Sequence, residues 1–112
     1  MKIQTRQADQ MDWVELEGDL DFHSSPDLRK ELTKLVEKQA PKIMIDFKKV
    51  TYIDSSGLAT FVELFQRVKR YNGKLVLFNM GASVRSVFEI SKLDTIFKLA
   101  GSEKEAVTLV QL

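Results

Sequence analysis

The chain has 112 residues, with 17 basic and 16 acidic side chains for a formal charge of +1, one histidine and no cysteine. A chain of this length forms about one ordinary domain, so we expect a single soluble domain over residues 1–112. The absence of cysteine excludes disulfides and thiolate metal sites and predicts a reducing compartment, the cytoplasm, while one histidine cannot build a multi-histidine zinc site. The charge balance gives no electrostatic case for nucleic acid, and no apolar run approaches the ~20 residues of a membrane span.

The first segment of the chain predicts two strands. Between Met11 and Asp21, Val14 and Leu16 alternate with glutamates, which is the period-2 pattern of a half-buried strand, and Gly18 is expected to break it. Residues 2–7 predict a shorter strand that precedes it, with a hairpin turn between the two.

The next segment predicts a helix followed by a buried strand. Ser25 suits the N-cap and Pro26 the first helical position. One apolar stripe then recurs at helical spacing, formed by Leu28, Leu32, Leu35 and Val36. Pro41 prevents the helix from continuing, and residues 42–47 form a nearly continuous apolar run, typical of a central strand covered on both faces.

The rest of the chain continues the alternation of helix and strand. A second helix is predicted to start around Ser56-Gly57 and to stop at Asn72-Gly73, with a buried stripe of Leu58, Phe61, Val62, Phe65 and Val68. The elements predicted after it are a strand over 75–78, a third helix capped by Ser83, a short strand over 96–99 and a terminal helix opened by the capping-box spacing of residues 102–105. This order predicts an α/β fold with a mostly parallel sheet.

The stretch from Val50 to Leu58 is the part of the sequence that points to function. It lies between the first buried strand and the second helix, where function is usually located in α/β folds. Unpaired N–H groups and the positive end of the helix dipole face these residues, so added negative charge is tolerated there. A phosphoryl group on a serine would add about −1.5 to −2 charges without melting the helix. Asp54-Ser55-Ser56-Gly57 is also an ordinary N-cap, and spacing alone favours that structural interpretation.

Several short groups of residues occur along the chain in a distinctive order. They are Gly18-Asp19-Leu20-Asp21 before Ser25-Pro26-Asp27-Leu28, Ile45-Asp46-Phe47 through Val50, Ile53-Asp54-Ser55-Ser56-Gly57-Leu58, Asn72-Gly73-Lys74-Leu75, Val84 to Phe88, and Leu93-Asp94-Thr95-Ile96-Phe97. Together they resemble the landmarks of the STAS domain of the bacterial anti-sigma factor antagonist family, and the resemblance covers nearly all of the chain. It implies the STAS fold, a small, mostly parallel mixed sheet of four to five strands packed with about four helices.

The resemblance also implies a phosphorylation switch. In that family the second hydroxyl residue of the Asp-Ser-Ser/Thr-Gly motif is phosphorylated; it corresponds to Ser56, with Asp54, Ser55 and Gly57 as flanking motif positions. The unphosphorylated antagonist binds an anti-sigma factor, which then releases its sigma factor. That anti-sigma factor is also a serine kinase that phosphorylates and releases the antagonist, and a phosphatase restores the active form. We expect a monomer between these encounters.

Asp19, Asp21, His23 and Ser24 would lie near this loop in the family fold, and we expect them on the same partner-binding face. Turn formation alone also explains the two aspartates. His23 with a serine and Asp21 suggests a catalytic triad, but the sequence has no Gly-x-Ser-x-Gly elbow and no oxyanion loop, so we expect no catalytic residue and no enzyme. The sequence also lacks a glycine-rich phosphate loop, and we expect neither a cofactor nor a metal.

Two other interpretations remain open. A phosphoacceptor receiver domain has a similar length and an α/β fold, and Asp46 could act as its aspartate, although no Lys-Pro pair follows the later strands. STAS modules also occur as subunits of stress-signalling assemblies, as partners of lipid-transport ATPases and as cytoplasmic tails of anion transporters. In such a complex the chain would be a binding module without a phosphorylation switch.

Overall fold

The computed structural model describes residues 1–112, which form one five-stranded sheet with four α-helices. The strands are β1 (Lys2–Ala8), β2 (Met11–Leu20), β3 (Lys42–Ile53), β4 (Lys74–Phe78) and β5 (Lys98–Ala100). The helices are α1 (Ser25–Glu37), α2 (Ser55–Arg70), α3 (Ala82–Ile90) and α4 (Glu103–Val110), with a short 3₁₀ turn, η1, at Leu93–Thr95.

The strands lie side by side in chain order, β1-β2-β3-β4-β5. β1 and β2 form an antiparallel hairpin through Asp9 and Gln10, which both have positive φ, as a two-residue hairpin turn requires. The pairs β2–β3, β3–β4 and β4–β5 are parallel, each joined by a crossover that contains a helix. The predicted α/β fold with a mostly parallel mixed sheet is therefore confirmed.

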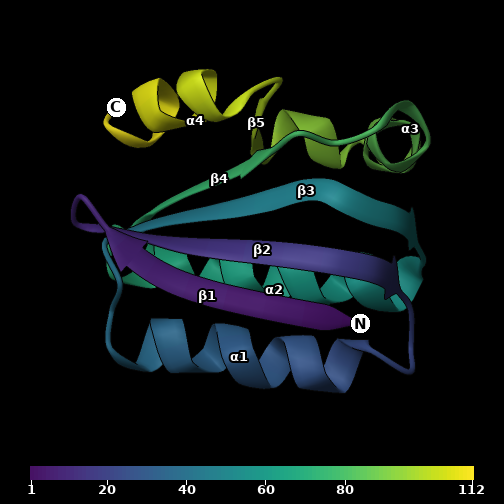
Figure 1. The fold of residues 1–112 in the computed structure, drawn as a ribbon, viewed down its shortest axis with the longest axis horizontal. Coiled ribbons are helices and arrows are strands. Elements are labelled where there is room, and N and C mark those ends of the chain that lie inside the picture. Colours follow the sequence, from purple (N-terminus) through teal and green to yellow (C-terminus); the bar gives the residue numbers. More distant parts are fainter.

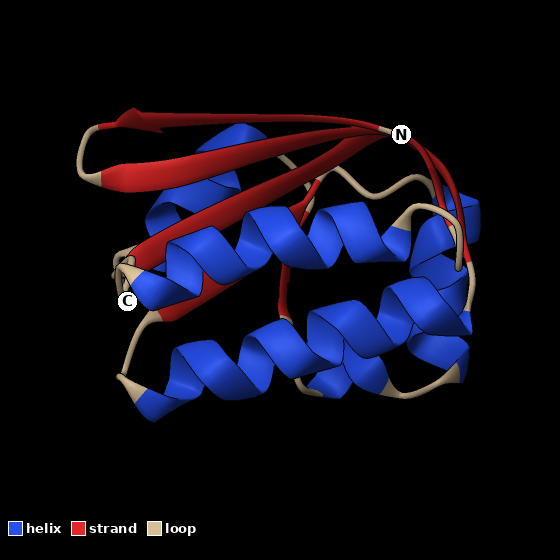
Figure 2. Cartoon of the chain, turned by 90° about the horizontal axis from the view of Figure 1, so that it is seen from below, coloured by secondary structure: helices blue, strands red, loops and turns tan.

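The sheet has a core on each face (Figures 1 and 2). The larger core lies between the sheet and α1, α2 and α3, and the smaller lies between the other face and α4. β3 contributes Ile43, Ile45 and Phe47 to the larger core and Met44 to the smaller one. This confirms the prediction that the apolar run of β3 is covered on both faces.

Two strands extend further than the sequence predicts. β2 continues through Gly18, whose φ of +111° accompanies an irregularity in the pairing with β3, and ends at Leu20. β3 runs to Ile53, because Val50 pairs with Gly18 and Ile53 with Leu20, and both side chains are buried. Most of the predicted loop before α2 is therefore strand, and only Asp54 separates β3 from the helix.

Some predicted element ends are also wrong by a few residues. Ser24, not Ser25, is the N-cap of α1, because Ser25 is already the first residue of the helix. α3 starts after Gly81 with no side-chain cap, so Ser83 lies inside the helix. The last strand begins at Lys98 instead of Ile96, because Ile96 has helical backbone angles and the N–H groups of Ile96 and Phe97 donate to the Leu93 carbonyl of η1. The cap of α4 is as predicted, since the Ser102 hydroxyl accepts from an N–H of the first turn.

Candidate functional site

Asp54 connects the end of β3 to the first turn of α2. Its backbone N–H donates to the Leu20 carbonyl of β2 at 2.9 Å. Its Oδ1 accepts hydrogen bonds from the N–H groups of Ser56 at 2.8 Å and Gly57 at 3.1 Å. Asp54 is therefore the N-cap of α2, as the structural interpretation of the sequence predicts, and the helix starts at Ser55, within one residue of the predicted start.

The two serines that follow Asp54 occupy the first two positions of α2. Ser55 is exposed and Ser56 is half-buried, and neither hydroxyl makes a hydrogen bond within the chain. The Ser56 carbonyl accepts from the buried Thr60 hydroxyl at 2.9 Å, which holds the backbone of this turn. Both hydroxyls are free to react, but no base contacts them.

Gly57 allows α2 to start directly against the ends of β2 and β3. A Cβ at this position would lie 2.8 Å from Cγ1 of Ile53, 3.0 Å from the Leu20 carbonyl oxygen and 3.1 Å from the Leu20 Cβ. These distances are shorter than ordinary van der Waals contacts, so only glycine fits without movement of the helix or the strands. The glycine of the motif thus fixes where the serines stand relative to the sheet.

The turn after β2 is held by its own side chains. Oδ1 of Asp21 accepts from the N–H groups of His23 at 2.9 Å and Ser24 at 3.0 Å. The Ser24 hydroxyl donates to the Asp19 carbonyl at 2.8 Å, and Ser24 is buried. The N–H of Ser24, with a smaller contribution from that of His23, holds the pKa of Asp21 below its ordinary value.

Parallel pairing brings this turn to the same end of the sheet as the serines. Leu20 pairs with Ile53, the residue before Asp54, and Asp19 pairs with Tyr52. The Thr51 hydroxyl donates to Oδ1 of Asp19 at 2.7 Å. The predicted site residues therefore lie at the carboxyl ends of two adjacent strands, where α/β folds commonly bind their ligands (Figure 1). Asp19 belongs to the end of β2, and Asp21, His23, Ser24, Asp54, Ser55, Ser56 and Gly57 follow the ends of β2 and β3.

Two aromatic residues that the sequence analysis did not assign to the site are exposed at this end. Phe22 in the turn is 64% exposed and Tyr52 near the end of β3 is 52% exposed. The Phe22 ring stacks on the His23 ring, with 4.0 Å between the ring centroids. Tyr52 points outward beside the inward Ile53, but Val50 and Ile53 are buried in the same core because the pairing is irregular at Thr51, so simple alternation along the sequence does not place Tyr52. No hydrogen bond joins the His23 ring to the hydroxyl of Ser55 or Ser56, so the structure forms no catalytic triad here.

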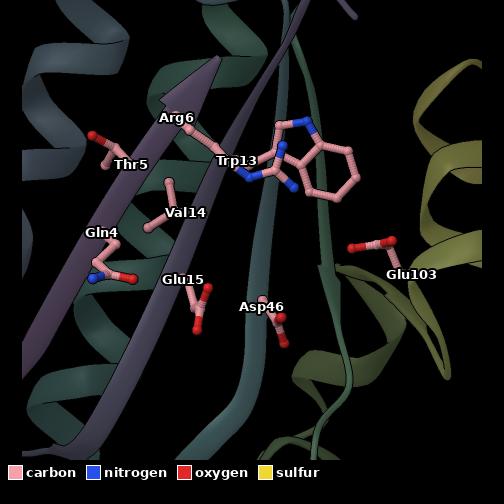
Figure 3. A pocket seen from close by; sticks show the side chains of 8 residues that line it. All are labelled: Gln4, Thr5, Arg6, Trp13, Val14, Glu15, Asp46 and Glu103. Atoms are coloured by element: carbon pink, nitrogen blue, oxygen red, sulfur yellow. The ribbon is translucent and has the colours of Figure 1, made fainter. Parts of the chain in front are cut away.

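A separate hollow of the surface lies beside α4 on the other face of the sheet (Figure 3). Its volume is about 460 Å³, and its lining residues are Gln4, Thr5, Arg6, Trp13, Val14, Glu15, Asp46 and Glu103. The Arg6 guanidinium lies over the Trp13 ring, 4.4 Å from its centroid, facing three carboxylates across the hollow. This excess of negative charge disfavours a nucleotide phosphate.

The chain shows neither a candidate metal-binding cluster nor a candidate membrane-spanning helix. No three His, Cys, Asp or Glu side chains converge in a way that could hold a metal ion. No helix has the length and apolar character needed to cross a bilayer.

Comparison with known proteins finds relatives over most of the chain. The STAS domain family matches residues 2–106. The anti-sigma-B factor antagonist of Bacillus subtilis (strain 168) is 35% identical over 94 residues, which are 84% of this chain and 85% of that protein. The anti-sigma-B factor antagonist of Listeria monocytogenes is 30% identical over 105 residues, which are 94% of this chain and 91% of that protein.

Solved structures share the fold. An anti-sigma factor antagonist from Mycobacterium paratuberculosis has a TM-score of 0.91 at 22% identity, covering 99% of this chain and 94% of its own. The anti-sigma factor antagonist SpoIIAA has a TM-score of 0.75 in its unphosphorylated form, at 21% identity and 98% coverage of both chains. The phosphorylated Bacillus SpoIIAA scores 0.74 at 23% identity, covering 96% of this chain and 97% of its own. The predicted STAS fold is confirmed, and the receiver-domain interpretation is wrong.

Proposed function

Since this chain belongs to the STAS domain family, with anti-sigma factor antagonists among its relatives, we propose that its unphosphorylated form binds an anti-sigma factor with serine kinase activity. That binding frees a sigma factor, and transfer of a phosphoryl group to Ser56 ends it. The observation that carries the proposal is the free Ser56 hydroxyl on the first turn of α2, at the end of the sheet where the turn after β2 also lies.

The helix start suits Ser56 as a phosphate acceptor. Asp54 already occupies the N–H groups of Ser56 and Gly57, so the helix stays capped whether or not the serine is modified. A phosphate at the second helical position also interacts favourably with the helix dipole. Phosphorylation is therefore expected to change the surface and to leave the fold intact.

The charges around Ser56 explain why a phosphate would weaken binding. Asp19, Asp21 and Asp54 all belong to this end of the sheet, and their hydrogen bonds come from a hydroxyl and from backbone N–H groups, with no lysine or arginine among the donors. No basic side chain pairs with these groups to offset a phosphate. The phosphate would add about −1.5 to −2 charges to a face that is already acidic, and desolvating it at an interface is costly.

The exposed aromatic residues supply the apolar part of the partner-binding face. Phe22 and Tyr52 flank the acidic turn and the serines, and exposed aromatic side chains are characteristic anchors of protein interfaces. His23 is exposed and stacks on Phe22, so it belongs to the contact surface. Ser24 and Gly57 are buried and act by holding the turn and the helix in place.

The chain acts in this scheme as a substrate and a switch, with no enzymatic activity of its own. The kinase is the anti-sigma factor, a separate phosphatase removes the phosphate, and both work with this chain as a monomer in the bacterial cytoplasm. Neither step needs a cofactor held by this chain.

The proposal is tested with the anti-sigma kinase encoded by the same bacterium. Ser56→Asp should weaken binding to that kinase roughly tenfold or more, because it places a carboxylate at the centre of the interface. Ser83→Asp is the control, since Ser83 is also a serine at the second position of a helix, although it is more exposed than Ser56, and this variant should bind normally. Undiminished affinity of Ser56→Asp would refute the switch.

The acceptor residue is identified by phosphate incorporation. With ATP and the kinase, Ser56→Ala should take up no phosphate and still bind, while Ser55→Ala should be labelled normally. Mass spectrometry of the peptide that contains both serines reports the position. Labelling that persists in Ser56→Ala would assign the acceptor to another hydroxyl.

A further inference from the structure

A groove lies at the other end of α2, where the helix ends beside the starts of β4 and β5. Its volume is about 380 Å³. Four apolar side chains line it, from α2, from β4 and from the segment before β5: Phe65, Val68, Leu75 and Ile96. Val68 and Leu75 are buried, whereas Ile96 is 46% exposed. The groove therefore has an apolar floor with one apolar side chain at its edge that nothing in the chain covers.

Three lysines surround this apolar floor, namely Lys69, Lys74 and Lys98. We call these lysines and the floor together the lysine groove. None of their ammonium groups takes part in an ion pair or a hydrogen bond within the chain, although seven ion pairs form elsewhere. No aspartate or glutamate lines the groove. A chain of net charge +1 thus gathers three unneutralised positive charges around one apolar hollow.

We propose that the lysine groove binds an acidic peptide segment of a partner protein, with an apolar side chain on the floor and carboxylates on the lysines. Free phosphate would use the lysines and leave the floor empty. A membrane surface favours apolar side chains that protrude, whereas Val68 and Leu75 lie at the bottom of a hollow. A peptide that carries both carboxylates and an apolar side chain pairs with the lysine ammonium groups and covers the apolar floor at the same time.

This binding surface is separate from the phosphorylation site. α2 crosses the length of the sheet, with Ser56 on its first turn and Lys69 on its last, so its two ends lie at opposite ends of the sheet (Figure 1). A segment bound in the lysine groove therefore contacts neither Ser56 nor the turn after β2. Binding there is compatible with either phosphorylation state, and it goes beyond the proposed function without depending on it.

The test measures fluorescence anisotropy of a labelled peptide made of glutamates around a central Phe-Leu pair, titrated with the full chain. The double variant Lys74→Glu/Lys98→Glu should weaken binding roughly tenfold, because two favourable charge pairs become repulsive. Lys30→Glu/Lys104→Glu changes the net charge equally at exposed lysines outside the groove and should bind like the wild type. Equal weakening by both pairs would mean nonspecific charge attraction and would overturn the proposal.

The apolar part is tested separately from the charge. Ile96→Ser should weaken the peptide roughly fivefold. Replacing the Phe-Leu pair of the peptide by Ser-Ser should have a similar effect on the wild type. Ser56→Asp should leave peptide binding unchanged, which distinguishes this surface from the switch. The same chain is also titrated with phosphatidylserine-containing vesicles. The absence of saturable peptide binding, or binding to the vesicles alone, would overturn the proposal.

Discussion

Gly57 is the residue through which the sheet fixes the position of the switch serine. Substitution by alanine adds one methyl group, and that methyl would lie 2.8 Å from Cγ1 of Ile53 and 3.0 Å from the Leu20 carbonyl oxygen. Neither neighbour is free to move, because Ile53 is buried and the Leu20 carbonyl accepts the hydrogen bond from Asp54. The first turn of α2 must therefore move away from the sheet and carry Ser56 with it.

The magnitude follows from two opposing effects. Forcing an extra carbon into a packed site costs about 1–3 kcal/mol. Alanine regains at most about 1 kcal/mol through its higher helix propensity. Taking about 2 kcal/mol for the packing cost and about 1 kcal/mol for the gain, the free energy of unfolding of Gly57→Ala should fall by about 1 kcal/mol, which corresponds to a melting temperature about 5 °C lower in a domain of this size.

Thermal and urea unfolding followed by circular dichroism measure this change. Gly81→Ala is the control, because Gly81, the N-cap of α3, also lies at a helix start but a Cβ there meets nothing within 4 Å, so its stability should fall by less than that of Gly57→Ala. Gly57→Ala should also reduce the rate of Ser56 phosphorylation by the kinase. Equal stability of the two variants would refute the close-packing explanation of this glycine.

Three further substitutions test the caps and the charges. Asp54→Ala should lower the unfolding free energy by about 1 kcal/mol through loss of the α2 cap, and Asp54→Asn should recover most of it. Lys38→Ala removes the ammonium group that lies 2.7 Å from Oδ1 of the buried Asp12, and it should lower the unfolding free energy by about 1–3 kcal/mol. Lys34→Ala removes a partner of the exposed Glu31 pair and should lower it by less than about 0.5 kcal/mol. Because folding lowers the pKa of Asp21, its carboxylate stabilises the fold at pH values above the ordinary aspartate pKa. The excess stability of the wild type over Asp21→Asn, measured by urea titration, should therefore shrink as pH falls below about 4. A pH-independent difference would refute that last assignment.

Local patterns carry much of the fold. The apolar run of β3 predicts a strand buried on both faces, and the Asp54 cap predicts the start of α2, because these signals depend on neighbours in the chain. Predicted element ends are less accurate where tertiary pairing extends an element. β2 continues past Gly18 and β3 past Phe47, because pairing between the two strands compensates for the low strand preference of Gly18 and Asp19 in β2 and of Lys48 and Lys49 in β3.

The sequence by itself determines the elements, the capped serine motif and, through resemblance, the family. Only the tertiary structure decides that the Asp21 turn and the Asp54 cap meet at one end of the sheet, that Phe22 and Tyr52 are exposed there, and that three lysines surround an apolar groove at the other end. These arrangements join residues far apart in the chain. They depend on strand register and helix crossing, which no short stretch of residues encodes alone.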